Sequence, residues 1–218
     1  MTQKTTENLI IHHLGVSQSD RVIWLMEELE LSYKLVWHNR SPEGGMPQAY
    51  LDLHPAATAP TIQDGARTLT ESVVILEYIC HTYGEGKLTV GPNQPNYYDY
   101  LYWMQFNNNV LGLFFAGAAA GLHATPRAET MQKFIKRRED RYYAYLEEHL
   151  GKTGFLAGDE FTCADIMVVF NLTALARMVG KTFSDQPNTR DYIERIGKRP
   201  AYIKAMQIAG PEAKPPGR

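Results

Sequence analysis

The sequence has few cysteines and no excess of either charge. Its 218 residues contain two cysteines, Cys80 and Cys163, far apart and outside any C-x-x-C pattern. Two such residues do not make a disulfide framework, and they suit a reducing cytosol. The 22 basic and 24 acidic residues leave a net charge of −2, without the basic excess that nucleic-acid binders carry. We therefore expect no nucleic acid as a partner.

The sequence also lacks long apolar runs. None reaches the ~18–20 residues that a bilayer requires, and residues 1–8 have no apolar signal centre. We expect a soluble, cytoplasmic protein without a membrane partner. His12 and His13 are neighbours on a predicted strand and therefore point to opposite faces of it. They cannot share a metal ion, and we predict none.

The first third of the chain alternates strand and helix patterns. Strands are predicted over residues 9–13 and 33–37, with an amphipathic helix over 19–30 between them as in a βαβ unit. A weak short helix, a hairpin turning at Asp64-Gly65 and another helix follow, over 47–53, 59–71 and 72–83. This order predicts an α/β domain of thioredoxin-like connectivity.

The second part of the chain is predicted to be helical. Residues 84–96 are rich in Gly, Pro and Asn and make the best linker in the sequence. The helical segments beyond it are 97–123, 126–150, 162–178, 191–197 and 200–208. We therefore predict two domains, a thioredoxin-like domain over 8–86 and an all-α domain over 97–210.

Two hydroxyl groups stand where the first helix begins. Ser17 and Ser19 follow the strand and precede the helix. The first N–H groups of a helix have no partner within it, and its dipole favours negative charge there. A hydroxyl at such a place can hold an anion, including a thiolate. The alternative is that both serines are simple helix caps.

Two further junctions could bind a ligand. Pro60 opens a predicted strand, and a cis bond there would turn the backbone of Ala59 outward to pair with an extended peptide. A trans proline on an edge strand is the alternative. Glu71-Ser72 lies where a strand gives way to a helix, so Ser72 is either an N-cap or a carboxylate-binding group. Glu71 could accept an ammonium group there.

These three sites suit one ligand, with a carboxylate and an ammonium at one end, a peptide-like middle and a group activated at the first helix. On these residues the chain resembles the cytosolic glutathione transferases over nearly its full length, in particular serine-type enzymes of bacteria and fungi. The other matching segments are residues 13–14, 27–29, 53–55, 156–158 and 162–165.

The resemblance implies a role for each matching position. Ser17 would face the glutathione thiol, with Ser19 as the rival for that role. Ala59, before a cis Pro60, would pair with the cysteinyl unit, and Glu71 and Ser72 would bind the γ-glutamyl end. Many relatives have Gly-Lys-Val before the proline, whereas residues 57–59 here are Ala-Thr-Ala. The glycine carboxylate would then fall to another cation, and the candidates are Arg40 and His54.

The resemblance also implies a hydrophobic electrophile, a homodimer and a detoxifying role. We expect the electrophile pocket on the first helix after the linker. The candidates for its lining are Tyr102, Trp103, Phe106, Val110, Phe114 and Phe115. The alternative is that this apolar stripe belongs to the core or to a dimer contact.

Thr162 and Asp165 have the spacing of a capping box, with Asp in place of the usual Glu. Phe161 and Ile166 occupy the positions of a hydrophobic staple around it. We interpret this segment as a folding element rather than as part of a site.

Three functions remain open on the sequence. The first is transfer of the glutathione thiolate to hydrophobic electrophiles. The second is peroxide or disulfide reduction through the thiol of glutathione itself, because neither cysteine lies at the first helix. The third is a non-catalytic binding protein of the same fold.

Overall fold

The computed structural model describes residues 6–121 and 125–215. The chain divides into two compact units, one of Met1–Thr89 with Arg195–Arg218 and the other of Val90–Glu194. Residues 122 and 123, at the end of a predicted helix, lie outside the described residues.

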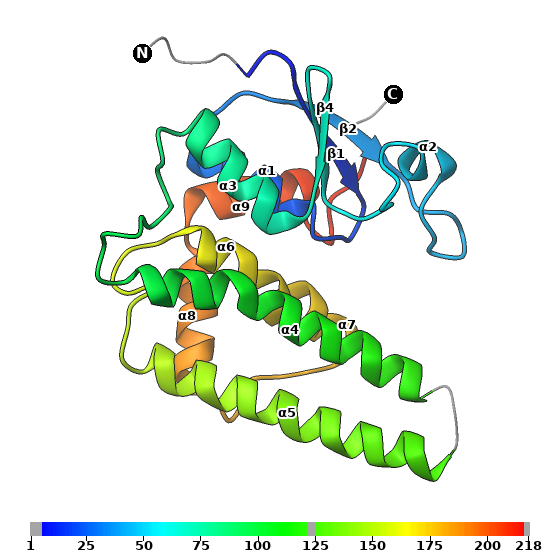
Figure 1. Ribbon diagram of the computed structural model, residues 1–218, viewed down its shortest axis with the longest axis vertical. Helices are drawn as coiled ribbons and strands as arrows, with labels where there is room; N and C mark the ends of the chain where they lie inside the picture. Colours follow the sequence, from blue (N-terminus) through cyan, green and yellow to red (C-terminus); the bar gives the residue numbers. More distant parts are fainter. Residues whose placement is uncertain (1–5, 122–124, 216–218) are drawn as a thin grey trace. The chain divides into compact units, whose positions relative to one another are not determined.

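A four-stranded mixed sheet forms the centre of the first unit (Figure 1). Its strands are β1 (Leu9–Leu14), β2 (Lys34–His38), β3 (Thr61–Asp64) and β4 (Arg67–Thr70), in the order β2-β1-β3-β4. β1 runs parallel to β2 and antiparallel to β3, which runs antiparallel to β4. The helix between β1 and β2 makes the expected βαβ unit, and the thioredoxin-like fold is confirmed.

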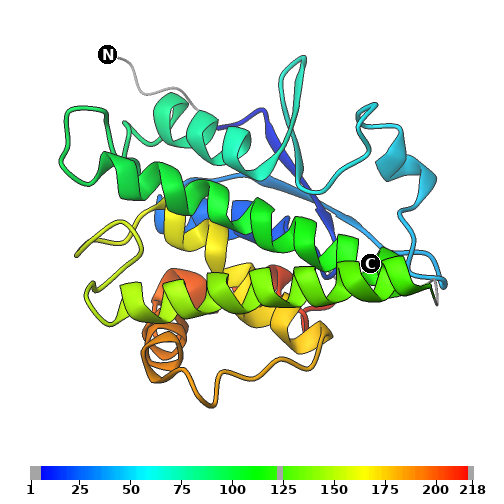
Figure 2. The ribbon, with the colours of Figure 1, turned by 60° about the horizontal axis from the view of Figure 1, so that its bottom comes forward.

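Helices cover both faces of this sheet. α1 (Asp20–Glu28), α3 (Ser72–Thr82) and α9 (Pro200–Ala209) lie on one side of it, and α2 (Gln48–Leu51) lies on the other (Figures 1 and 2). The apolar faces that the sequence predicts for α1 and α3 are buried, which removes them from water. The fully buried core side chains of the unit include Leu9, Ile11, Val22, Leu25, Ile62, Ile75 and Ile79.

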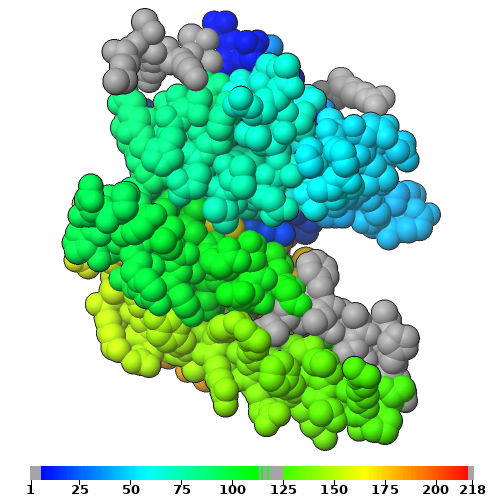
Figure 3. Space-filling model, viewed as in Figure 1, coloured from blue at the N-terminus to red at the C-terminus, as the bar shows by residue number. Residues whose placement is uncertain are grey.

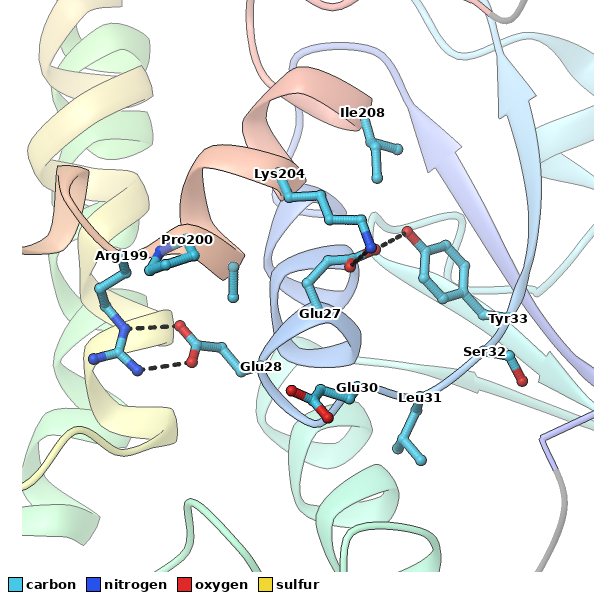
Figure 4. Close-up of a pocket in the computed structure, with 11 residues that line it drawn as sticks. Glu27, Glu28, Glu30, Leu31, Ser32, Tyr33, Arg199, Pro200, Lys204 and Ile208 are labelled. Carbon is cyan, nitrogen blue, oxygen red and sulfur yellow. Dashed lines mark hydrogen bonds and ion pairs between the residues drawn. The ribbon is translucent and has the colours of Figure 1, made fainter.

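Two ion pairs fasten α9 to α1. Arg199 donates from Nε and Nη2 to the two carboxylate oxygens of Glu28, at 2.8 and 2.7 Å. Glu27 pairs with Lys204 at 2.6 Å and accepts from Tyr33 Oη at 2.9 Å. Figure 4 shows these pairs in the pocket that they line at the end of α1. These contacts explain why residues 195–218 join the first unit, although residues 195–210 were expected within the helical domain.

The second unit is built from helices. They are α4 (Tyr97–Gly121), α5 (Pro126–Leu150), α6 (Cys163–Phe170), a π-helical turn (Asn171–Leu175), α7 (Ala176–Met178) and the greater part of α8 (Pro187–Gly197), which the unit boundary crosses after Glu194. α4 and α5 lie side by side (Figure 2), and their side chains meet along the face seen in Figure 3. None of the helices in the described ranges is long and apolar enough to cross a membrane.

α8 begins four residues before the start that the sequence predicts. Glu147 of α5 accepts hydrogen bonds from the backbone N–H groups of Asn188 and Thr189, at 2.9 and 2.8 Å. A carboxylate from another helix therefore serves the first turn of α8, where N–H groups lack partners within the helix. That carboxylate is 41 residues away in sequence from Asn188.

The start of α6 is a complete capping box. Thr162 Oγ1 accepts from Ala164 N, while Asp165 Oδ2 accepts from Thr162 N at 2.8 Å. Asp165 Oδ1 accepts from Leu156 N at 3.0 Å and from Tyr192 Oη at 2.8 Å. The capping box predicted from the sequence is confirmed, and its carboxylate also joins two other segments of the unit.

Candidate functional site

Three loops meet at one end of the sheet in the first unit. β1 ends at Leu14, and β3 runs antiparallel beside it, so the start of β3 lies next to the end of β1. β4 reverses direction again, and Thr70 at its end pairs with Thr61 at the start of β3. The segments around Ser17, Ala59-Pro60 and Glu71-Ser72 therefore leave the sheet at the same edge.

Ser17 and Ser19 form a hydrogen-bonded cluster with the end of β1. Ser17 Oγ donates to Leu14 O at 2.6 Å and lies 2.7 Å from Ser19 Oγ. Ser19 Oγ also accepts from Leu14 N at 3.2 Å and lies 2.8 Å from His13 Nδ1. Ser17 is 8% exposed, whereas Ser19 and His13 are fully buried. Ser17 is therefore the hydroxyl nearer to the surface.

Helix capping was the alternative role for Ser17, Ser19 and Ser72, and it is wrong for Ser19 and Ser72. Ser19 occupies the N-cap position of α1, yet its side chain makes no capping hydrogen bond. Ser72 is the first residue of α3, and Glu71 is the N-cap. In both cases the hydroxyl has another partner: Ser19 meets His13 and Ser17, and Ser72 Oγ accepts from Arg21 Nη1 at 3.2 Å.

The two other junctions have distinctive backbones. The Ala59–Pro60 peptide bond is cis, as the resemblance implies. Glu71 has a φ of 71°, in the region that residues other than glycine rarely adopt. Such conformations persist only where the surrounding structure holds them, and they are concentrated at active and ligand-binding sites. Glu71 is exposed while Ser72 beside it is buried.

Asp20 and Arg21 belong to this region, and the sequence reasoning did not assign either of them a role. Arg21 is 1% exposed and joins α1 to α3 through Ser72. Burial raises the pKa of Asp20 to about 7, although the charge and backbone N–H of Arg21 lower it. Asp20 Oδ1 has no donor within the described part of the chain. The Ser-x-Arg pattern of residues 19–21 includes Arg21, but it does not predict the contact of Arg21 with Ser72.

Comparisons with known proteins give the family. Models of the glutathione S-transferase N-terminal and C-terminal domains match residues 17–82 and 111–200. The chain is 27% identical to glutathione S-transferase 3 of Schizosaccharomyces pombe, over 88% of this chain and 84% of that protein. It is 28% identical to glutathione S-transferase GstB of Escherichia coli K12, over 86% of this chain and 92% of that protein. The chain belongs to the glutathione S-transferase family.

Solved structures support the same architecture. A glutathione S-transferase from Actinobacillus pleuropneumoniae superposes with a TM-score of 0.85 at 25% identity, over 94% of both chains. A theta-class enzyme from Xanthomonas axonopodis, solved with glutathione bound, superposes with a TM-score of 0.70 at 23% identity, over 93% of this chain and 99% of that one. This glutathione transferase thus has the two-domain architecture of its family, with thioredoxin-like and helical parts.

Arg40 and His54, the two candidate cations of this glutathione transferase, have different surroundings. Arg40 donates to the carbonyl oxygens of Gly15, Gly44 and Val16, at 2.8, 2.9 and 3.1 Å. It therefore holds the loop that leads to Ser17. His54 Nδ1 accepts from Ala56 N at 3.1 Å, which leaves the hydrogen of the neutral ring on Nε2 as a possible donor.

The candidate electrophile-pocket residues on α4 fall into two groups. Trp103, Phe106 and Val110 are buried, as the core alternative expects, and Trp103 stacks on Tyr145 with ring centroids 5.6 Å apart. Tyr102 and Phe114 are partly exposed. Val110 and Phe114 also line a pocket inside the helical unit, with Ile135, Tyr143 and Leu175. The side chain of Phe115 lies outside the described residues.

Proposed function

We propose that in this glutathione transferase Ser17 holds the glutathione thiol as a thiolate, which then attacks a hydrophobic electrophile. The observation that carries the proposal is the meeting of Ser17, cis Ala59–Pro60 and Ser72 at one end of the sheet. Ser19 is the weaker candidate for contact with sulfur, because it is fully buried whereas Ser17 is 8% exposed.

A hydrogen bond from Ser17 can supply the free energy that ionisation of the thiol requires. A thiol with a pKa of about 8.5 is only about 3% ionised at neutral pH, and lowering that pKa by two units requires about 2.7 kcal/mol. One hydrogen bond to a charged group supplies about 1.5–3 kcal/mol. Full ionisation gains at most about 30-fold in rate. The rest of any acceleration must come from holding the electrophile near the sulfur.

The remainder of glutathione would follow the same edge of the sheet. Ser72, at the first turn of α3, would receive the γ-glutamyl carboxylate, because the N-terminal end of a helix favours an anion. Exposed Glu71 would accept the ammonium group. The backbone of Ala59 would pair with the cysteinyl unit, and His54 or Arg40 would meet the glycine carboxylate.

Transfer is favoured over thiol–disulfide exchange through a protein cysteine. Cys80 and Cys163 are both fully buried, whereas a reacting cysteine must reach its partner. We further propose a hydrophobic electrophile, partly exposed Tyr102 and Phe114 as groups that meet it, a homodimeric cytoplasmic enzyme and a role in detoxification. The family membership supports each of these.

Replacement of Ser17 tests the proposal. We expect Ser17→Ala to raise the pKa of bound glutathione by about two units and to lower conjugation about 30-fold near neutral pH. The ultraviolet absorbance of the thiolate measures the first effect, and a panel of electrophiles and peroxides measures the second. Ser32→Ala is the matched control, because its hydroxyl has a partner, Thr6, away from the site. An unchanged thiol pKa in Ser17→Ala would refute the assignment.

A further inference from the structure

Behind Ser17 lies a chain of two more side chains that end in a buried imidazole. We propose that His13 and Ser19 form a hydrogen-bond relay that occupies Ser17 as an acceptor and leaves it able only to donate to the ligand, so that the site accepts a thiolate and disfavours a thiol. His13 and Ser19 are then positioning residues that act through Ser17. This inference rests on the proposed function and extends it to residues that the sequence did not single out for this task.

The direction of the relay follows from counting hydrogen atoms. Ser17 Oγ lies 2.6 Å from Leu14 O, and a carbonyl oxygen only accepts, so the single hydroxyl hydrogen of Ser17 lies in this contact. The 2.7 Å contact between Ser17 Oγ and Ser19 Oγ must then use the hydrogen of Ser19. Ser19 is therefore the donor and Ser17 the acceptor between the two hydroxyls.

The same count fixes the tautomer of His13. With its hydrogen committed to Ser17, Ser19 Oγ can only accept in its 2.8 Å contact with His13 Nδ1. His13 must therefore carry its hydrogen on Nδ1. The other ring nitrogen, Nε2, is buried without a partner in the described part of the chain. Burial, helped by the nearby charges of His38 and Arg40, lowers the pKa of His13 to about 4, so the ring is neutral at pH 7.

The position of the imidazole ring is also constrained. His13 is fully buried on β1, and Trp37 of β2 meets its ring edge to face, with centroids 4.3 Å apart.

Ser19 Oγ accepts a second hydrogen bond, from Leu14 N at 3.2 Å. With both acceptor positions of Ser19 filled, its own hydrogen is left to point at Ser17.

The consequence for sulfur follows from the acceptor positions of Ser17. Its oxygen accepts from Ser19 Oγ and from Ser19 N, at 2.7 and 3.3 Å. A serine hydroxyl has two acceptor positions and one hydrogen. An arriving thiolate can accept the hydrogen bond that Ser17 donates to Leu14 O in the ligand-free protein. The S–H of a thiol, by contrast, would find no free acceptor position on Ser17. The relay thus favours the ionised form of the ligand.

Variants along the relay give graded expectations. We expect Ser19→Ala to raise the pKa of bound glutathione by about one unit, a tenfold smaller thiolate-to-thiol ratio at a given pH. His13→Leu removes only the far donor, and we expect a rise of about half a unit, a threefold smaller ratio. His13→Asn offers an amide N–H near the place of Nδ1 and should restore the wild-type thiol pKa. Binding of S-methylglutathione, which cannot ionise, should change less than twofold in all three.

His12→Leu is the matched control. His12 is a buried histidine on the same strand, but its ring bonds to His38 and Gln63, at 3.0 Å each, rather than to the serines. Its replacement should leave the thiol pKa unchanged. An equal rise of the glutathione thiol pKa in His12→Leu and His13→Leu would show that the effect comes from sheet packing, and it would overturn the relay.

One measurement needs no variant. Nitrogen NMR of the ligand-free wild-type protein reports which ring nitrogen of His13 carries hydrogen, and we expect Nδ1. Hydrogen on Nε2 would refute the relay even if every variant failed to fold. An unchanged thiol pKa in folded His13→Leu would refute it as well. By contrast, absence of glutathione binding by the wild type, or no effect of Ser17→Ala, would refute the proposed function itself.

Discussion

Two helix starts in this chain carry similar residues and use them in opposite ways. At α6, Thr162 and Asp165 serve the backbone N–H groups of their own first turn. At α1, Ser19 holds the N-cap position but points its hydroxyl to Ser17 and His13. The first N–H groups of α1 turn back to carbonyl oxygens of residues 17–19 instead. A cap residue that does not cap its helix is available for another task.

The carboxylates beside the two starts differ in the same way. Asp165 accepts four hydrogen bonds, from Leu156, Tyr192 and twice from Thr162. Asp20 Oδ1 has no donor among the described residues. Burial raises both pKa values, to about 6 for Asp165 and about 7 for Asp20. The hydrogen bonds of Asp165 thus stabilise the start of α6, whereas α1 retains an unfavourable carboxylate near the candidate site.

The largest loss of stability should come from replacing Asp165. Asp165→Asn places an NH₂ group against donors that now meet a carboxylate, and such unsatisfied buried groups cost about 1–3 kcal/mol each. We expect the free energy of unfolding to fall by about 3 kcal/mol in urea titrations. Exposed Asp191→Asn is the control and should change little. A loss below about 1 kcal/mol would mean that the four hydrogen bonds of Asp165 do not hold the second unit together.

Asp20 should give the opposite sign and a dependence on pH. Folded Asp20 keeps its proton up to about pH 7, whereas the unfolded chain releases it near 3.8. Between these values the folded state binds more protons, so the stability contributed by this group falls as pH rises. Asp20→Asn cannot titrate and should be more stable than the wild type by about 4 kcal/mol at pH 8, with little difference at pH 4. Urea unfolding at both pH values measures this, and equal differences at both would contradict the buried, raised carboxyl.

Local patterns explain what the sequence could predict. The turn at Asp64-Gly65, the alternation of strands and helices and the capping box at Thr162 depend on neighbours within a few residues. The opposite orientation of His12 and His13 also follows from the period of a strand, and their separate partners confirm it.

Contacts between distant segments explain what the sequence could not. Capping of α3 was one of the two roles open to Ser72, but Arg21, 51 residues away, donates to its hydroxyl instead. The start of α8 depends on Glu147, and the place of α9 depends on Glu27 and Glu28. The tautomer of His13 needed the positions of all three hydrogen-bonded side chains. A spacing rule can mark such residues but cannot tell which partner each one meets.

The smallest expected effect is that of Thr162→Ala, and it distinguishes the hydroxyl of Thr162 from that of Ser19. Thr162→Ala removes a working cap, and we expect a loss of about 1 kcal/mol in the free energy of unfolding. The pKa of glutathione bound to this variant should remain that of the wild type, because Thr162 has no part in the proposed site. Ser19→Ala should do the reverse, since its hydroxyl caps nothing but supports Ser17. If both variants lowered stability alike and neither moved the thiol pKa, the two helix starts would be equivalent. The hydroxyls of α1 would then serve the fold alone.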